Sequence, residues 1–148
     1  MFETITNLRR VKLTIEPAPE GAIKMSCIND VTKYIREIPE FKEYLNSQEV
    51  FIGLYLNNYN KILGYQIIGL GSDVGVVVDP KIICAAAILS LSKRVIVAHN
   101  HPSGNLEASK NDYLITKNIK HALGLFEITL LDSFIITNDS QHSIIDEA

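Results

Sequence analysis

The sequence predicts a mixed α/β fold, in which a mixed β-sheet is flanked by helices and preceded by a short N-terminal arm. Stretches of alternating apolar residues, typical of strands, are interspersed with apolar stretches that begin at helix-capping residues. The 148 residues are 47% hydrophobic and 21% charged, which is the composition of an ordinary globular protein. A chain of this length is expected to form one main domain that buries roughly two thirds of its unfolded surface.

Residues 1–24 are predicted to form an arm that joins the main domain, residues 25–148. Val11, Leu13 and Ile15 alternate with polar residues, which indicates an edge strand, and prolines and a glycine then break the chain. That strand could pair within the chain or with a second copy, so a homodimer is one expectation. The N-terminus is charged where a signal peptide needs an apolar segment, and no apolar run is long enough to span a bilayer. We therefore expect a mature cytoplasmic protein.

The main domain is predicted to begin with a helix and a β-hairpin. Ser26 can cap a helix that continues to Ile38 and is stopped by Pro39. From residue 49 to 57, apolar side chains occupy both faces of a strand. A polar turn follows, and residues 61–71 return as a second strand, so the pair is expected to form a hairpin.

The second half is predicted to alternate between helices and strands. Residues 79–92 begin with an Asp-Pro pair, which supplies an N-cap and a first helical position. Residues 94–98 are apolar on both faces, as expected of a central strand. Ser109 opens another helix, which Gly124 closes. Residues 126–138 are expected to form two short strands.

Charge and cysteine content narrow the possible functions. The net charge is −3, and the one dense basic cluster consists of Arg9, Arg10 and Lys12. A nucleic-acid binder usually concentrates many Lys and Arg side chains on one face, so nucleic acid is a less favoured partner. The two cysteines, Cys27 and Cys84, form no CxxC pair and are expected to be small buried hydrophobes.

The predicted central strand runs directly into two histidines. His99 and His101 are separated by one residue, so in extended backbone both project from the same face, as two ligands of one ion require. Asp112 is the candidate third ligand, because it leads the apolar stripe of the helix that begins at Ser109 and so faces inward. An ionised carboxylate in that position is costly unless a positive charge meets it. Zinc prefers imidazole nitrogen, often completed by a carboxylate.

Each part of this pattern also has a plainer interpretation. The two histidines can belong to a polar turn that binds nothing. Ser109 and Asp112 match a capping box, S-x-x-D, which alone would explain both residues. The two roles are compatible, because a cap fixes the direction in which Asp112 points. The complete spacing, H-x-H-x7-S-x2-D, is far more specific than any of its parts.

The segment HNHPSGNLEASKND resembles the motif of JAB/MPN (JAMM) metalloproteases. The longer pattern AHNHPSGN…S..D…LLDSFII is similar to the RadC branch of that family, as is VVVDPKIICAAA upstream. The resemblance extends from about Gln48 to the C-terminus and implies a cytidine deaminase-like fold of the JAB/MPN type. It implies that His99, His101 and Asp112 hold zinc. It also implies that Glu49 is the general acid/base and that Ser109 helps to stabilise the oxyanion.

A site of this kind implies hydrolysis of a peptide or isopeptide bond in a peptide or protein substrate. Zinc polarises the scissile carbonyl, and Glu49 would move a proton from water to the leaving amine. Glu43 and Glu107 are competing candidates for that role. Glu49 is preferred because it precedes the face formed by Phe51 and Gly53, where the glycine leaves space for a close neighbour.

Two other functions stay open at this point. The RadC label suggests a DNA-repair or DNA-processing accessory protein, which the charge balance does not favour. The fold could also serve as a non-catalytic scaffold, although a pure scaffold need not keep a complete ligand set. The remaining histidines, His121 and His142, are expected to be surface residues.

Overall fold

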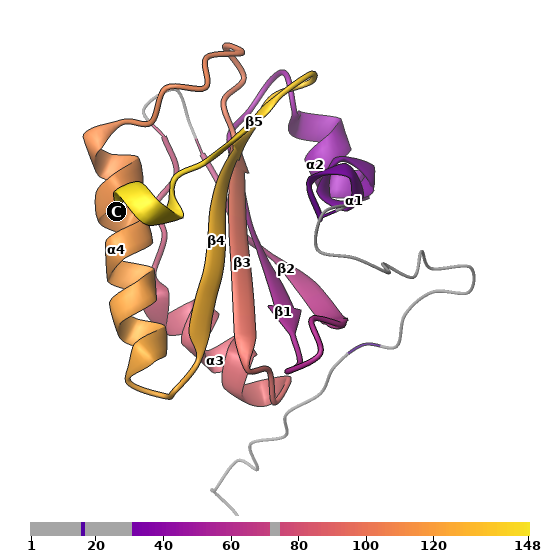
Figure 1. Cartoon of the computed structure of the whole chain (residues 1–148). Coiled ribbons are helices and arrows are strands. Elements are labelled where there is room, and N and C mark those ends of the chain that lie inside the picture. Colours follow the sequence, from indigo (N-terminus) through magenta and orange to yellow (C-terminus); the bar gives the residue numbers. More distant parts are fainter. Residues whose placement is uncertain (1–15, 17–30, 72–74) are drawn as a thin grey trace, which may run out of the picture.

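A five-stranded mixed β-sheet forms the centre of the protein, in a computed structural model that describes residue 16, residues 31–71 and residues 75–148. The strands lie in the order β2-β1-β3-β4-β5 (Figure 1). β3 and β4 are parallel, and the other neighbouring pairs are antiparallel. Their bounds are β1 Val50–Leu56, β2 Ile62–Leu70, β3 Arg94–Asn100, β4 Thr129–Ile136 and β5 Gln141–Ser143.

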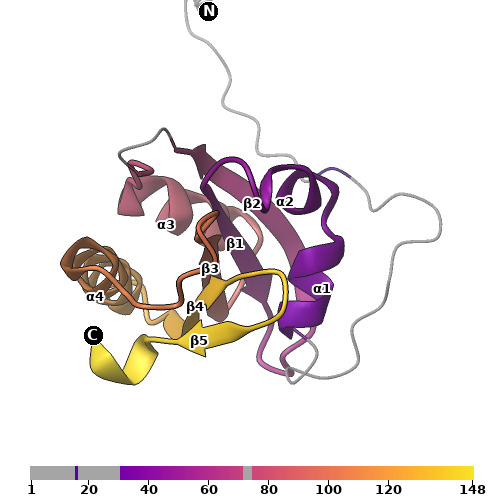
Figure 2. The ribbon, with the colours of Figure 1, turned by 90° about the horizontal axis from the view of Figure 1, so that it is seen from above.

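Helices cover both faces of the sheet. α1 and α2 pack on one face, and α3 and α4 pack on the other, as the view from above shows (Figure 2). A short 3-10 helix, Ile145–Glu147, follows β5. The helix bounds are α1 Val31–Glu37, α2 Pro39–Tyr44, α3 Pro80–Leu89 and α4 Lys110–Gly124.

Alternation along β1 and β3 divides the core into two layers. Even-numbered side chains, such as Ile52 and Ile96, pack with α1 and α2, whereas odd-numbered side chains, such as Phe51 and Val97, pack with α3 and α4. The two strands are antiparallel, and Phe51 is paired with His99. The end of β3 therefore directs odd-numbered side chains toward α4.

Most predicted elements are confirmed. The hairpin β1–β2 forms, and the side chain of Asp79 caps α3 by accepting a hydrogen bond from the backbone N–H of Lys81. Cys84 is buried, as expected. Gly104 has a φ of 82° in the turn that follows β3, a conformation that favours glycine. The predicted arm, the Ser26 cap and Cys27 lie outside the described residues.

The prediction that a helix stops at Pro39 is confirmed, because α1 ends at Glu37. A second helix, α2, was not predicted, and Pro39 occupies its first turn, where the missing N–H costs nothing. The prediction for the last strands was wrong. Residues 126–138 contain one strand, β4, instead of two. Its polar centre stays in the sheet because the hydroxyl of Ser133 hydrogen-bonds that of Thr116 on α4 at 2.9 Å. A separate short strand, β5, then forms beyond residue 138, where no strand was predicted.

Candidate metal centre

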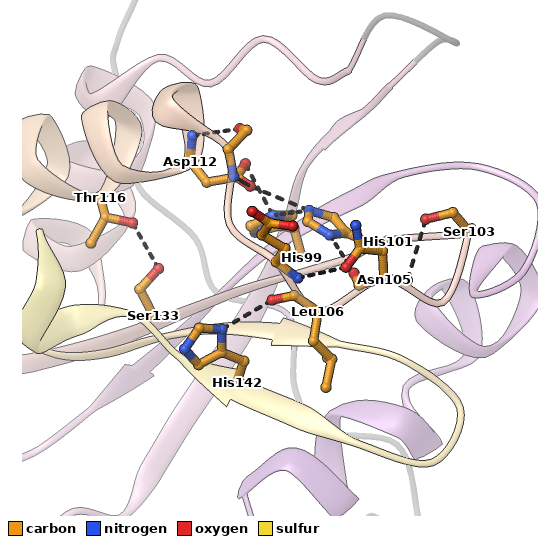
Figure 3. Close-up of polar contacts among 11 residues, drawn as sticks. His99, His101, Ser103, Asn105, Leu106, Asp112, Thr116, Ser133 and His142 are labelled. Carbon is orange, nitrogen blue, oxygen red and sulfur yellow. Dashed lines mark hydrogen bonds and ion pairs between the residues drawn. The ribbon is translucent and has the colours of Figure 1, made fainter.

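Three side chains converge where β3 ends and α4 begins. His99 is the sixth residue of β3, and His101 follows the strand directly. Their Nε2 atoms lie 3.1 Å apart. The Asp112 carboxylate lies between them, with Oδ1 3.2 Å from Nε2 of His99 and Oδ2 3.3 Å from Nε2 of His101 (Figure 3). The structure thus brings together the three residues that the sequence selected as ligands.

The first turn of α4 fixes the direction of the Asp112 side chain. The Ser109 hydroxyl accepts a hydrogen bond from the backbone N–H of Asp112 at 3.0 Å, and Asp112 Oδ2 accepts one from the backbone N–H of Ser109 at 2.9 Å. The predicted capping box is therefore present. It does not exclude the ligand role, because the same carboxylate also faces both histidines.

Charge complementarity holds this cluster together. Burial alone would raise the pKa of the Asp112 carboxyl, but hydrogen bonds from His101 and His99 outweigh it and hold that pKa well below its usual range. The hydrogen bond with Asp112 is also the main cause that raises the pKa of His101. A positive charge between the three side chains, carried by a proton or by a metal ion, is therefore stabilised.

Neighbouring groups orient the two imidazoles. Nδ1 of His101 lies 2.7 Å from the carbonyl oxygen of Asn105. A carbonyl can only accept, so Nδ1 carries a hydrogen, and a metal ion that replaces the Nε2 proton would meet the Nε2 lone pair. The ring of His99 stacks on Phe51, with centroids 5.6 Å apart and planes 8° apart. Nδ1 of His99 is buried and has no hydrogen-bond partner among the described residues.

The three donor atoms suit a metal ion. Each residue contributes one nitrogen or oxygen atom, and all three atoms lie within 4.8 Å of one another. Two imidazoles and one carboxylate are ordinary ligands of divalent transition metals. His99 is only 2% exposed and Asp112 only 8%, so the ligands are fixed within the protein and are not free to move at its surface.

Glu49 lies beside this cluster and immediately before β1. Its side chain lies on the α4 side of the sheet, because it lines a cavity together with Phe51, which is paired with His99, and with Asp112 of α4. Glu49 lines a cavity of about 280 Å³ together with His101, Ser109 and Asp112. Burial is the main cause that raises the pKa of its carboxyl, and the nearby histidines oppose the shift.

The competing glutamates do not share this position. Glu43 and Glu107 are exposed and line neither of the cavities that border the centre. One argument for Glu49 was nevertheless wrong. A Cβ atom at Gly53 would approach the Tyr55 hydroxyl to 3.0 Å and Ile68 to 3.1 Å, so the space beside that glycine serves packing within the sheet and not the site.

Ser109 also borders the cavity that contains Glu49. Its hydroxyl oxygen accepts the capping hydrogen bond from Asp112, so its own hydrogen stays available to donate toward the cavity. Four of the five predicted site residues therefore line one cavity, and the fifth, His99, contacts two of them, His101 and Asp112. Among the described residues, Glu49 makes no direct hydrogen bond or ion pair to the ligand side chains.

The sequence reasoning missed two polar residues near the centre. Asn100, between the two histidines, is completely buried and points to the opposite face of the sheet. Its alternation with Ile96 and Ala98 could have indicated that Asn100 is buried and hydrogen-bonded, because a polar side chain in a core layer needs partners.

The prediction that His142 is a surface residue needs correction. His142 is only partly exposed, and its Nδ1 lies 3.0 Å from the carbonyl oxygen of Leu106. His121 is exposed, as predicted.

None of the described helices is long and apolar enough to cross a membrane.

Comparison with known families gives one match that covers most of the chain. The model of the RadC-like JAB domain family matches residues 25–148. That range includes every residue of the candidate metal centre.

Curated relatives support the same assignment. A UPF0758 protein of Streptococcus suis is 34% identical over 116 residues, which are 78% of this chain and 45% of the relative. A UPF0758 protein of Halorhodospira halophila is 40% identical over 88 residues, or 60% of this chain and 39% of the relative. One from Xylella fastidiosa is 38% identical over 91 residues, or 62% of this chain and 41% of the relative. The matched part of this chain thus spans less than half the length of these relatives.

Proposed function

The chain belongs to the RadC-like JAB domain family, and from this premise we propose that it is a zinc-dependent hydrolase of peptide or isopeptide bonds. The observation that carries the proposal is the convergence of His99, His101 and Asp112 beside a cavity that His101, Asp112 and Glu49 line. Such a set combines the ligands of a catalytic metal with a carboxylate placed for proton transfer.

The donor set and its spacing support zinc as the metal. Zinc bonds of about 2.0–2.1 Å in tetrahedral geometry place neighbouring ligand atoms about 3.3–3.4 Å apart. The nearest separations here are 3.1, 3.2 and 3.3 Å. Three protein ligands would also leave a fourth position open, which is the arrangement of catalytic zinc sites and not of structural ones. Two of the residues that would hold the ion, His101 and Asp112, border the same cavity as Glu49 and Ser109.

Each residue around the centre has a separate role in the proposed reaction. Zinc held there would supply Lewis acidity for the scissile carbonyl and for a water molecule. The Glu49 carboxylate accepts a proton as the water oxygen bonds to the carbonyl carbon, and it delivers that proton to the nitrogen as the C–N bond breaks. The Ser109 hydroxyl donates a hydrogen bond to the oxygen on which negative charge develops. The products are a carboxylate and a free amine.

The surroundings of the centre suit a chain substrate. A second cavity of about 540 Å³ borders the centre and shares Glu49 and His101 with the first one. Polar uncharged residues, including Ser47, Gln48 and Ser103, line it. Two cavities that share these residues provide room for the parts of a polypeptide that precede and follow the scissile bond, as a peptidase or isopeptidase requires.

Metal analysis combined with a peptide library tests this proposal. Purified protein is dialysed against zinc, its metal content is measured, and it is then incubated with a proteome-derived peptide library and with glycyl-lysine isopeptides. We expect about one zinc ion per chain and new peptide termini detected by mass spectrometry. The His99→Ala variant should lack both, whereas His121→Ala, which changes an exposed histidine, should keep both. A wild-type protein that binds no zinc would contradict the proposal.

A further inference from the structure

Asn100 lies between the two histidines but belongs to a different contact network. Its side chain points to the face that α1 and α2 cover, and it is completely buried. Oδ1 accepts a hydrogen bond from the backbone N–H of Val50 at 2.6 Å. Nδ2 donates to the carbonyl oxygens of Leu45 and Gln48, both at 2.9 Å. One amide group therefore satisfies three buried backbone groups of another segment.

These partners lie on both sides of Glu49. Asn100 holds the carbonyl of the residue before it and the N–H of the residue after it. The carbonyl oxygen of Glu49 accepts a hydrogen bond from the backbone N–H of Gly71 at 2.7 Å. Gln48 adds a side-chain hydrogen bond to the carbonyl oxygen of Gly71, also at 2.7 Å. Glu49 thus has no regular secondary structure of its own, and its backbone is held by these long-range contacts.

We propose that Asn100 is a positioning residue, which fixes the Glu49 carboxylate relative to the two histidines that flank Asn100 in the sequence. This inference rests on the proposed function, in which Glu49 transfers the proton. Asn100 shares rigid strand backbone with His99 and continues directly into His101. The position of the base relative to the metal ligands is therefore set by hydrogen bonds that join the segment before β1 to the end of β3.

Only an amide meets the requirements of this position. The segment before β1 presents one N–H and two carbonyl groups, so the residue must accept once and donate twice. An aspartate can accept but cannot donate, and an apolar residue can do neither. The other even-numbered residues at this end of β3, Ile96 and Ala98, are apolar. A buried amide there costs free energy unless it is fully hydrogen-bonded, so packing alone does not account for it.

Small displacements of a catalytic group have large effects on rate. A misplacement of about 1 Å can lower a rate by roughly 10²-fold, even when the altered residue does not touch the substrate. Loss of the Asn100 contacts would free the backbone on both sides of Glu49 without touching a ligand atom. We therefore expect turnover to fall while metal binding persists.

The test compares Asn100→Asp, which keeps the shape and the acceptor but loses both donors, with Ser133→Ala as the matched control. Ser133→Ala removes another buried polar group of the same sheet, and this group hydrogen-bonds Thr116 instead of the segment around Glu49. Zinc content should stay at about one per chain in both. For a substrate found with the wild-type protein, kcat of Asn100→Asp should fall by roughly 10²-fold with KM nearly unchanged.

A double-mutant cycle separates positioning from general stability. In a Glu49→Gln background, Asn100→Asp should cause no further loss of kcat, because the group that it positions is already inactive. A loss that adds in full to that of Glu49→Gln, or an equal loss in Ser133→Ala, would overturn the inference. Asn100→Ser, measured with excess zinc to stabilise the fold, is the milder variant. Failure of both Asn100 variants to fold, while Ser133→Ala folds, would assign Asn100 a structural role instead.

Hydrogen exchange keeps the inference testable if the proposed function fails. If the wild-type protein cleaves no peptide, the exchange of backbone amides is compared in the zinc-treated proteins. The amide of Gly71, which donates to the Glu49 carbonyl, should exchange at least about tenfold faster in Asn100→Asp than in the wild type, and at an unchanged rate in Ser133→Ala. Unchanged protection in the Asn100 variant would overturn the positioning role, whatever the activity of the protein.

Discussion

The three candidate metal ligands and Glu49 meet at one cavity, which His101, Asp112 and Glu49 line, but different kinds of structure hold them in place. His99 and His101 take their direction from the alternation of β3, and Asp112 takes its direction from the capping box of α4. These side chains also contact one another, at 3.1–3.3 Å. Glu49 precedes β1 in irregular backbone, and Asn100 and Gly71 hold it there.

This difference separates two properties of the site. The ligands are positioned by local rules that act within a few residues, so the metal site can form wherever β3 and α4 pack. The base is positioned by contacts between segments that are 22 to 52 residues apart. Substitutions should therefore be able to remove the base function while the metal site stays intact. The predictions below test that separation.

Substitution of Asp112 by asparagine should have the largest effect, because it removes the negative charge that both histidines face. Zinc at about 100 times its Kd should stabilise the wild-type protein by roughly 2.7 kcal/mol. In a chain of this size that is an increase in Tm of about 5–10 °C. Thermal unfolding with and without zinc should show this increase in the wild type and in Asp139→Asn, which changes an exposed carboxylate, and none in Asp112→Asn. An equal increase in Asp112→Asn would contradict the ligand assignment.

Glu49→Gln should strongly reduce catalysis but leave zinc binding intact, which is the reverse of a ligand substitution. The amide keeps the size of the side chain but cannot accept a proton, so kcat should fall by about 10²–10⁴-fold. The zinc-dependent increase in Tm should persist, because Glu49 is not one of the ligands. Glu43→Gln is the matched control, since it changes an exposed glutamate on α2 and should leave both properties unchanged. Loss of zinc in Glu49→Gln would show that the base and the ligands are not separable.

The same contrast explains what the sequence could predict. The positions of His99, His101 and Asp112 follow from strand alternation and from helix capping, which are rules of local spacing. The hairpin and the Asp79 cap follow from similar rules. All of these were predicted, and the structure places them as expected.

The features that were missed depend on contacts between distant segments. The partners of Asn100 lie 50 to 55 residues away in sequence, so no local pattern identifies them. β4 continues through Asp132 and Ser133 because α4 and β5 supply hydrogen-bond partners for them. In the sequence alone, the polar residues Asp132 and Ser133 instead indicated a break between two strands. A single sequence without its tertiary contacts cannot separate a polar residue that breaks a strand from one that is satisfied within it.

Ser109→Ala should have an intermediate effect on the ligand side of the comparison. Removal of the hydroxyl leaves the backbone N–H of Asp112 without its cap, which should cost about 1 kcal/mol and lower Tm by about 2–4 °C. Ser109→Thr keeps a hydroxyl and should retain most of this stability. Thermal unfolding of the metal-free proteins measures the capping effect alone. A Tm of Ser109→Ala equal to that of the wild type would show that the capping box does not stabilise α4.

The smallest expected effect concerns the C-terminal segment. This segment contacts the loop between His101 and Asp112 but neither of these two ligands. Nδ1 of His142 donates to the carbonyl of Leu106, and its Nε2 lies 3.4 Å from the Glu147 carboxylate. Glu147 also accepts a hydrogen bond from the Tyr113 hydroxyl at 2.6 Å. The backbone hydrogen bond to Leu106 and the contact with Glu147 raise the pKa of His142 above 6.5. The hydrogen bond from Tyr113 is the main cause that lowers the pKa of Glu147 below 4.5.

The signs of these two shifts define a pH window. A raised histidine pKa means that His142 stabilises the fold fully below pH 6.5, and that this contribution is lost as the pH rises through its folded-state pKa. A lowered carboxyl pKa means that the contribution of Glu147 is present above pH 4.5 and is lost as the pH falls further. In metal-free protein, the Tm difference between the wild type and His142→Gln should therefore be largest at about pH 5.5 and shrink toward about pH 8.5. His121→Gln should show no such trend, because that histidine is exposed. A difference that grows with rising pH would show that the neutral form of His142 makes the stabilising contact, and the segment would then respond to pH in the opposite direction.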